Sequence, residues 1–386
     1  METPQYPLAL TFDDILLLPG FSDFTRSDIN LSTQFTKKIS LKLPFVSAPM
    51  DTVTESKLAI TLAEFGGIGI IHRNLSPEQQ AKEVQKVKKK GLLVGAAIGA
   101  SSGFEKRAEM LMKSNVDVIV IDSAHGYEKS VIETTRFLKK TYSYVQVIAG
   151  SIATFNGAQA LIEAGADALR VGMGPGAICT TRIISGMGVP QVTAILETVR
   201  AASNAAGAGS GQAVPVIADG GIKYSGEMIK ALALGASTVM MGGFFASALE
   251  SPGKVVELDR AHVPHRFQSI FNKPKETYTF KEYRGMGSVG AMQQGAKVKA
   301  ESEFHGKSYK DRVLIAEGVE GLVPVKGTVK ELLDQAVGGI RSGMFYVGAK
   351  TIPELQEKTQ FVRITQASLV ESHPHDVLIT NPGENY

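Results

Sequence analysis

The sequence predicts a (β/α)8 barrel, and three observations favour this fold class. Short apolar runs recur at intervals of roughly 20–30 residues, as in parallel α/β proteins built from βα units. Segments with helical periodicity lie between these runs. Polar residues and glycines gather after the runs, at the strand ends where such a barrel carries its active site. An open doubly wound sheet is the weaker alternative.

Eight candidate strands account for the apolar runs. They are residues 44–50, 67–72, 92–99, 116–123, 145–150, 168–172, 215–219 and 237–242. The segments between them place apolar residues three and four positions apart, as in 55–65, 77–89 and 104–113. Ser76 and Pro77 combine an N-cap residue with a proline at the first helical position, which predicts that a helix begins there.

Residues 252–330 interrupt this alternation, because they have few apolar periods and many charges. A structureless insertion of that length inside a compact domain is usually functional, often a lid. We therefore expect one catalytic domain spanning 1–386, with 252–330 as a flap. The helical pattern resumes from Val329 to Ile340, and the polar tail 371–376 is expected to be disordered unless a neighbouring subunit uses it.

Composition narrows the classes of protein that fit. With 386 residues, 44% of them hydrophobic, the chain can bury a large core, and its net charge of +3 suggests neither nucleic-acid nor membrane binding. A single cysteine excludes an internal disulfide and fits a reducing compartment. The N-terminus does not resemble a signal peptide, and no apolar run reaches membrane-spanning length. We expect a cytoplasmic protein.

The single cysteine, Cys179, lies in a glycine-rich loop, 172–182, directly after a candidate strand. Glycines allow tight turns and close approach of the backbone to a ligand. A thiol presented from such a loop suits a covalent nucleophile, since thiolate attack needs exposure and nearby positive charge or amide dipoles. The alternative is a small buried apolar residue, which the loop makes less favourable.

Two glycine pairs follow the seventh and eighth candidate strands, where barrels commonly bind phosphate. The backbone amides of Gly221, Gly242 and Gly243 would bind an anion there, and Tyr283 would add a hydroxyl donor. Asp219 is placed to accept hydrogen bonds from a ribose diol. The sequence therefore predicts a phosphorylated substrate, although turns also use glycine pairs routinely.

Asp122 and Ser123 end the fourth candidate strand, where an acidic residue suits the ribose of a second nucleotide such as NAD. No strand–GxGxxG–helix unit is present, so a dinucleotide would not bind as in a Rossmann fold. Arg73 and Arg182 are candidate counter-charges, although each more often forms a surface or barrel ion pair. The histidines lack metal-ligand spacing with Cys179.

These segments together resemble the IMP dehydrogenase / GMP reductase family, and over nearly the whole length its dehydrogenase branch. The matching segments are 10–14, 47–54, 66–72, 122–126, 172–182, 218–222, 283–288, 317–321 and 371–376. The cysteine loop and the run Tyr-Arg-Gly-Met-Gly-Ser at 283–288 are the most specific of them.

The resemblance implies covalent chemistry at Cys179, which would attack C2 of a purine nucleotide. Hydride would pass between C2 and a nicotinamide, leaving a thioimidate intermediate. A dehydrogenase uses NAD and water to convert IMP to XMP, whereas a reductase uses NADPH to convert GMP to IMP and ammonia. Thr181 and Glu317 match a pair that moves protons to and from the reacting water or ammonia.

The resemblance also implies binding roles. Those for the nucleotide fall on Met50, Ala177, Asp219, Gly221, Gly242, Gly243, Tyr283, Gly285, Met286, Gly287 and Glu317. Those for the dinucleotide fall on Asp122, Ser123, Gly172 and Gly174. Those for K+ or another monovalent cation fall on Gly174, Gly176 and Cys179, with Glu371, Ser372 and His373 from an adjacent subunit of a homotetramer.

Three departures from the family pattern bear on function. The paired regulatory CBS modules are absent, because 86–91 runs straight into the third candidate strand. Ala177 replaces a phosphate-loop serine and so removes one hydroxyl donor. Lys299 and Ala300 occupy the positions of a flap Arg-Tyr pair that activates water, and lysine is a base only when its pKa is strongly lowered. Arg312 is a candidate substitute.

Three functions follow from these observations. The first is an IMP dehydrogenase without regulatory modules. The second is a GMP reductase, which the missing Arg-Tyr pair favours. The third is a non-catalytic protein that binds purine nucleotides, against which the retention of Cys179 and Thr181 counts.

Overall fold

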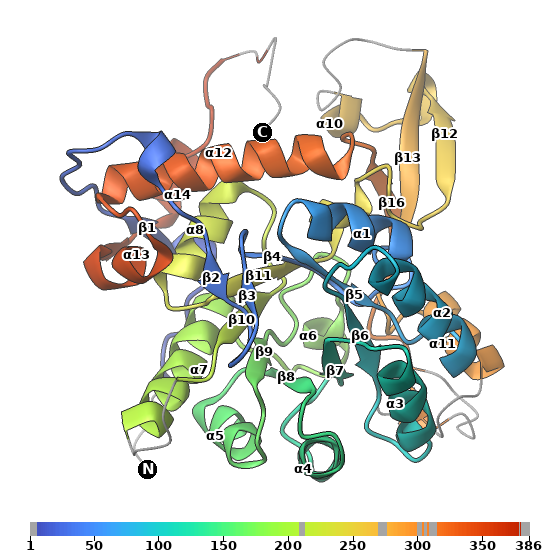
Figure 1. The fold of residues 1–386 in the computed structure, drawn as a ribbon. Helices are drawn as coiled ribbons and strands as arrows, with labels where there is room; N and C mark the ends of the chain where they lie inside the picture. Colours follow the sequence, from blue (N-terminus) through green and yellow to red (C-terminus); the bar gives the residue numbers. More distant parts are fainter. Residues whose placement is uncertain are drawn as a thin grey trace, which may run out of the picture.

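Eight parallel strands close into a barrel at the centre of the computed structural model (Figure 1). They are β4 (Phe45–Ser47), β5 (Ile68–Ile71), β6 (Gly95–Ile98), β7 (Val118–Asp122), β8 (Gln146–Ile152), β9 (Ala168–Val171), β10 (Val216–Asp219) and β11 (Thr238–Met241). Neighbours along the chain pair with each other, and β11 pairs with β4 to complete the circle. The predicted fold class is confirmed, and the doubly wound alternative is wrong.

The structure describes residues 6–207, 213–268, 276–298, 303–304, 307–308, 315–377 and 379. Each barrel strand falls on one of the eight predicted runs, and only β8 continues past its predicted range. The regular spacing of the apolar runs was therefore sufficient to identify every strand of the barrel.

A ring of helices covers the outside of the barrel. They are α1 (Ser56–Glu64), α2 (Pro77–Lys88), α3 (Phe104–Lys113), α4 (Lys129–Thr141), α5 (Phe155–Glu163), α7 (Gln191–Ala205), α8 (Ser225–Ala233) and α12 (Val329–Val347). The Ser76 hydroxyl accepts a hydrogen bond from the Gln79 amide at 3.1 Å, so α2 begins as predicted. Helix α12 starts at the predicted residue and packs against α1 and α8.

The connection between α2 and β6 is short. Helix α2 ends at Lys88 and β6 begins at Gly95, with all the intervening residues described. No further module lies between them, as the sequence predicts.

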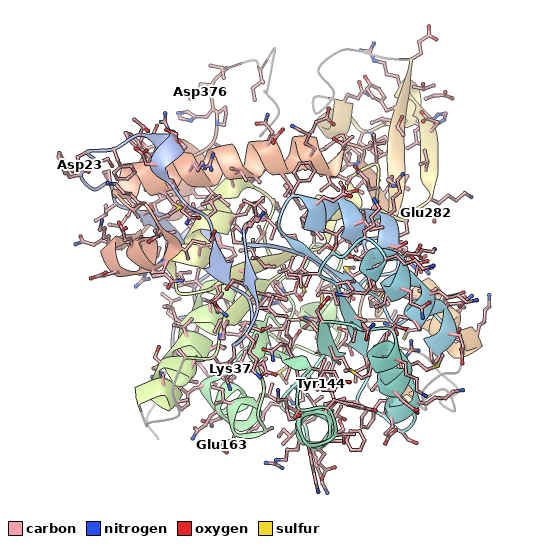
Figure 2. All side chains as sticks on the ribbon, in the orientation of Figure 1. Asp23, Lys37, Tyr144, Glu163, Glu282 and Asp376 are labelled. Atoms are coloured by element: carbon pink, nitrogen blue, oxygen red, sulfur yellow. The ribbon has the colours of Figure 1, made fainter. Side chains whose placement is uncertain are left out.

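Two apolar layers form the core. Inside the barrel, Val120, Ile148 and Ile217 pack together, while Ile119 and Leu169 face the helices. Neighbouring strand residues belong to different layers because successive side chains point to opposite faces. Figure 2 shows the side chains that fill this interior, with labelled polar residues such as Asp23 and Glu163 at the margin of the molecule.

The excursion after β11 has regular structure in its described residues. Strands β12 (Val255–Asp259), β13 (Thr277–Arg284) and β16 (Glu320–Pro324) form an antiparallel sheet beside the barrel (Figure 1). The remaining elements are α9 (Gly243–Ala246), α10 (His265–Gln268), α11 (Val289–Val298), β14 (Glu303–Phe304) and β15 (Lys307–Ser308). Val263, Tyr278 and Phe280 form a small separate core.

The expectation of a structureless insertion is therefore wrong for this sheet. Tyr278 and Phe280 alternate with more polar residues, and this period of two is the signal of a half-buried strand. The charges of β13 obscured the pattern, because Lys281 is buried in the same strand in which Glu282 is exposed.

Segments near the two ends of the chain pair on one side of the barrel. Strand β1 (Ile15–Leu17) pairs with β17 (Phe361–Arg363), and α13 (Ile352–Lys358) and α14 (Gln366–Glu371) lie near α12 (Figure 1). A short hairpin, β2 (Thr33–Gln34) with β3 (Ser40–Leu41), closes the end where the barrel strands begin. Among the described residues, no helix is both long and apolar enough to span a bilayer.

Candidate active site

The cysteine loop leaves the barrel at the carboxyl end of β9. Its backbone is fixed locally by the Cys179 amide, which donates to the Gly176 carbonyl at 3.0 Å, and by a β-bridge from Cys179 to Gly318. The thiol is half-buried rather than enclosed in the apolar interior. The alternative of a small core residue is therefore wrong.

A chain of hydrogen bonds joins the three predicted catalytic residues. The Cys179 thiol donates to the Thr181 hydroxyl at 3.3 Å, and that hydroxyl donates to Oε2 of Glu317 at 3.0 Å. The Thr180 amide also donates to the Glu317 carbonyl at 3.2 Å, which fixes the backbone on both sides. Thr181 opens the short helix α6 (Thr181–Ile184), and Glu317 comes from the excursion, 136 residues later. The site is thus built from two distant parts of the chain.

The glycine pair after β11 packs directly against β13. A Cβ on Gly242 would lie 2.7 Å from the Tyr283 hydroxyl and 2.9 Å from the Met50 sulfur, so only glycine allows this approach. The Tyr283 hydroxyl bonds the backbone of Gly243. Burial raises the pKa of Tyr283, and the Asp219 carboxylate raises it further, so the phenol stays protonated and can donate.

The second glycine pair turns the chain after β10. Gly220 and Gly221 have φ of +87° and +74°, the left-handed region that favours glycine. Both approach Pro175, so this turn contacts the cysteine loop. The two predicted phosphate loops and the nucleophile therefore gather at the same end of the barrel.

A buried row of charges crosses the barrel, and it contains a residue that sequence reasoning missed. Arg170 on β9 donates to Asp122 at 2.7 Å and to Asp219 at 2.8 Å. Arg73 lies 3.5 Å from the other oxygen of Asp122. The signal was available, since Arg170 is a lone charge within an apolar strand run.

The ion pairs keep this row charged. Burial acts to lower the pKa of Arg170, but Asp219 and Asp122 outweigh it and the pKa is raised. Burial raises the pKa of Asp219, although Arg170 opposes the shift. We assign the ionised form to this carboxylate because a direct 2.8 Å bond to a guanidinium stabilises the anion.

The residues predicted for a dinucleotide have mixed surroundings. Asp122 has a side chain only 4% exposed and turned toward arginines. Ser123, in contrast, lies at the edge of an exposed polar loop, with its hydroxyl 3.2 Å from the His125 carbonyl. Gly172 and Gly174 have packing reasons to be glycine, because an added Cβ would lie 2.1 Å from the Asp219 carbonyl and 2.8 Å from Arg182, respectively.

Met286, predicted to contact the base, lies in an apolar cluster with Met50 and Met292. The Gly287 carbonyl accepts from the Glu317 amide at 3.0 Å, so this segment is tied to the proton-handling carboxylate. Gly285 lies beside it and donates to the Val319 carbonyl at 3.0 Å.

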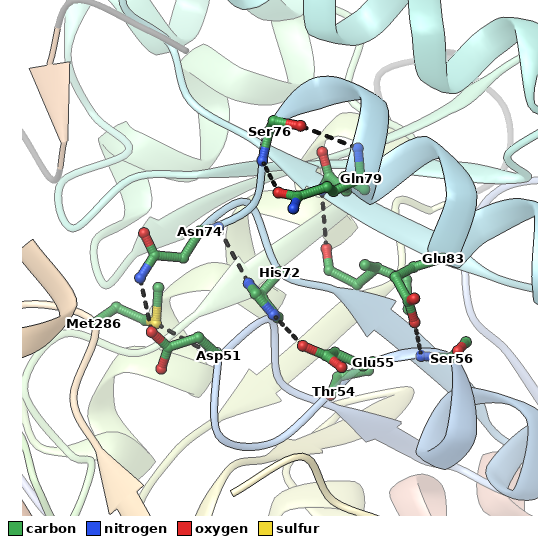
Figure 3. A network of polar contacts seen from close by, with 12 residues as sticks. Asp51, Thr54, Glu55, Ser56, His72, Asn74, Ser76, Gln79, Glu83 and Met286 are labelled. Carbon is green, nitrogen blue, oxygen red and sulfur yellow. Dashed lines mark hydrogen bonds and ion pairs between the residues drawn. The ribbon is translucent and has the colours of Figure 1, made fainter. Parts of the chain in front are cut away.

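A polar network borders this segment (Figure 3). The Asp51 amide contacts the Met286 sulfur at 3.4 Å, and the Asp51 carboxylate accepts from Asn74 at 2.7 Å. His72 accepts from the Asn74 amide at 3.1 Å and contacts Glu55 at 3.4 Å. Asp51 therefore contacts Met286 directly, and His72 supports it through Asn74.

The two halves of the predicted cation site lie apart within one chain. Gly174, Gly176 and Cys179 belong to the loop after β9, whereas Glu371 ends α14 on the α12 side of the barrel (Figure 1). In the described ranges, no three His, Cys, Asp or Glu side chains are grouped to hold a metal ion.

The other sequence-based candidates have separate outcomes. Arg73 forms the barrel ion pair described above, while Arg182 donates to the Val189 carbonyl at 2.8 Å. Lys299, Ala300 and Arg312 lie outside the described residues.

Comparisons with known proteins agree with this geometry. The family model "IMP dehydrogenase / GMP reductase domain" matches residues 9–375. The chain is 41% identical to the inosine-5'-monophosphate dehydrogenase of Borreliella burgdorferi, over 96% of this chain and 97% of the relative. It is 40% identical to that of Cryptosporidium parvum over the whole of both chains.

A third relative differs in length. The inosine-5'-monophosphate dehydrogenase of Aquifex aeolicus is 38% identical over 98% of this chain and 97% of its own. That alignment runs over 505 positions, against 386 residues in this chain. The relative therefore contains a long segment that this chain lacks.

Proposed function

The chain belongs to the IMP dehydrogenase / GMP reductase family, and we propose that it oxidises IMP to XMP with NAD through a covalent adduct on Cys179. The observation that carries this proposal is the hydrogen-bonded series from Cys179 through Thr181 to Glu317. A protein that only bound nucleotides would not need this series.

The first half of the reaction uses Cys179 as nucleophile. Its thiol proton passes to Thr181 as the Thr181 proton passes to Glu317, and the thiolate attacks C2 of the purine. A bound NAD would supply the acceptor for the hydride that leaves C2. The product of this half is a thioimidate on Cys179.

The second half uses the same pair in hydrolysis. Glu317 first releases to solvent the proton that it received in the first half. Thr181 then takes a proton from a water molecule as its own passes to Glu317, and the water oxygen attacks C2. The C–S bond then breaks, the sulfur recovers a proton, and XMP is released. Two proton transfers by one pair explain why a threonine and a carboxylate lie beside the thiol.

Binding of the nucleotide would use both glycine turns. Gly221, Gly242 and Gly243 would donate backbone amides to the phosphate, with Tyr283 as a further donor. Asp219 would accept from the ribose with Oδ1, because Arg170 occupies Oδ2. Met50, Gly285, Met286 and Gly287 would border the base, and Ala177 would contact the phosphate only through its backbone.

The dinucleotide would lie over the exposed loop after β7. Ser123, Gly172 and Gly174 fit such a ligand because they follow the carboxyl ends of β7 and β9, the end of the barrel that carries the cysteine loop. Asp122 would reach a ribose only by giving up its contact with Arg73.

We also propose a monovalent cation, such as K+, held by backbone carbonyls of Gly174, Gly176 and Cys179. Carbonyl oxygens are the ligands that K+ takes in proteins. The remaining ligands, Glu371, Ser372 and His373, would come from a second subunit, since α14, which ends at Glu371, lies on the α12 side of its own barrel. A homotetramer supplies such a neighbour to every subunit.

The second candidate is a GMP reductase. It is favoured by Lys299 and Ala300, which occupy the positions of the Arg-Tyr pair used by dehydrogenases to activate water. Thr181 and Glu317 suffice for the proton transfers of either reaction.

Steady-state assays separate these functions. IMP with NAD is expected to yield XMP and NADH, and GMP with NADPH is expected to yield nothing. The reverse result would assign the reductase. A Cys179→Ala variant is expected to lose turnover in either case, and full activity of this variant would exclude both enzymes.

A further inference from the structure

We propose that Asp51 is a positioning residue that acts through Arg284 to hold the base-contact segment, 285–287, over Cys179. This inference rests on the proposed function, because it deepens the account of the same site. Asp51 follows β4, whereas Arg284 ends β13 of the excursion. The pair therefore joins the barrel to the excursion.

The geometry of the pair is that of a fork. Arg284 donates from Nη2 to Oδ2 of Asp51 at 2.6 Å, and its Nε lies 3.1 and 3.2 Å from the two carboxylate oxygens. The Asp51 side chain is 6% exposed. Buried contacts of a planar guanidinium with a carboxylate fix orientation as well as distance. The Arg284 amide adds a bond to the Thr52 hydroxyl at 3.3 Å.

Asn74 bonds the same carboxylate oxygen, Oδ2, that accepts from Nη2 of Arg284 (Figure 3). Its side-chain amide donates to Asp51 at 2.7 Å and to the Ala291 carbonyl at 3.1 Å. Because Ala291 lies in α11, Asp51 is connected to elements on both sides of the base-contact segment. Asn74 is buried, and His72 fixes its backbone.

This support leads directly to the reacting groups. Met286 and Gly287 follow Arg284 in the chain, and the Gly287 carbonyl accepts from the Glu317 amide. Glu317 in turn accepts from Thr181. Releasing Arg284 would therefore loosen the base contacts and the proton-handling carboxylate together, without touching the thiol.

The test uses the fact that Cys179 is the only cysteine. Iodoacetamide labels this thiol, and mass spectrometry measures the rate of labelling. The IMP concentration that halves this rate, called the concentration for half-protection, measures nucleotide binding without turnover. The variants are Asp51→Asn, Arg284→Gln and the double variant. Asp51→Asn preserves the shape of the side chain while removing its charge.

The matched control is Asp167→Asn. Asp167 is also 6% exposed and pairs with Lys139 at 2.6 Å, but it precedes β9 at the opposite end of the barrel. Its loss should lower the melting temperature and leave the IMP concentration for half-protection unchanged.

For Asp51→Asn we expect labelling without IMP at the wild-type rate, and a rise of about tenfold in the IMP concentration for half-protection. We expect kcat/KM for IMP to fall on the order of 100-fold, since small misplacements of reacting groups have effects of that size. Arg284→Gln should match it, and the double variant should be no worse than either single variant.

Three results would overturn the proposal. The first is an unchanged IMP concentration for half-protection in Asp51→Asn, and the second is an equal rise of that concentration in Asp167→Asn. The third is additive losses in the double variant, which would mean that Asp51 contacts the nucleotide itself. Failure of the proposed function would give a different result, since the wild-type protein would then neither oxidise IMP nor be protected by it.

Discussion

The barrel and the excursion differ in how they are built, although each supplies part of the site. Every residue of β5, β6 and β7 is buried, because helices cover the outside and side chains fill the inside. Strand β12 of the excursion alternates between exposed and half-buried residues, and its sheet has one small core. The barrel supplies Cys179 and Thr181, and the excursion supplies Glu317 and Tyr283.

The difference shows what fixes the positions of the site residues in each region. Close packing fixes the barrel side of the site, since interiors of this density tolerate little displacement. The excursion depends instead on a few polar connections, chiefly Tyr283 with Gly243 and Arg284 with Asp51. Apart from Cys179 and Thr181, substitutions in the barrel should therefore act mainly on stability, and substitutions in the excursion mainly on turnover.

The largest effect on turnover is expected for Glu317→Gln, which removes the excursion's share of the proton transfer. General acid–base groups contribute about 10²–10⁴-fold, so kcat should fall by that factor while the melting temperature stays near that of wild type. Steady-state kinetics and thermal unfolding check both parts.

Thr181→Val provides the comparison from the barrel side. Because Thr181 and Glu317 act as one series, the double variant should lose little more than Glu317→Gln alone. Multiplicative losses would show that the two residues act in separate steps.

The sequence predicted the barrel well and the excursion poorly, for related reasons. Fully buried strands produce continuous apolar runs, which can be recognised whatever residues lie on the surface. In the excursion, Tyr278 and Phe280 were hidden among polar residues, and the buried face of β13 changes along the strand, since Lys281 and Tyr283 are buried as well.

The site divides in the same way. Cys179, Thr181 and Glu317 were predicted from motifs, and the structure brings these three together. Arg170 was missed because it belongs to no motif. Arg284 lies in the matched run 283–288, but it was given no role because its partner, Asp51, is far away in sequence. Arg170 could have been predicted as a buried charge, because it lies within an apolar run.

Arg170→Met tests the barrel side of the comparison. Removing one partner of a buried ion pair costs about 3–5 kcal/mol, because the other charges stay buried without compensation. The free energy of unfolding should fall by that amount, measured by urea denaturation. Asp51→Asn in the polar connection should reduce it far less, and equal losses would contradict the contrast between the two regions.

Tyr283→Phe removes the hydroxyl of the excursion that we propose as a phosphate donor. A hydrogen bond to a charged group contributes about 1.5–3 kcal/mol, so Kd for IMP should rise about 10- to 100-fold. Calorimetric titration measures this change, and an unchanged Kd would remove Tyr283 from the phosphate site.

The pH dependence of IMP binding tests the same hydroxyl donor. Burial raises the pKa of Tyr283 above its ordinary value of about 10, so the phenol still donates at that pH. Its contribution is therefore complete below pH 10 and is lost only as the pH rises further, when a phenolate would repel the phosphate. Tyr283→Phe should lack this alkaline loss.

The smallest effect is expected for Ala177→Ser. This variant tests whether the barrel side of the proposed phosphate site already provides enough hydrogen-bond donors. Ala177 is exposed on the cysteine loop, so a hydroxyl adds no strain to the packed interior. One added hydrogen bond of about 1 kcal/mol would lower KM for IMP about fivefold. If KM does not change, the glycine turns and Tyr283 already satisfy the phosphate, and the missing serine costs the protein nothing.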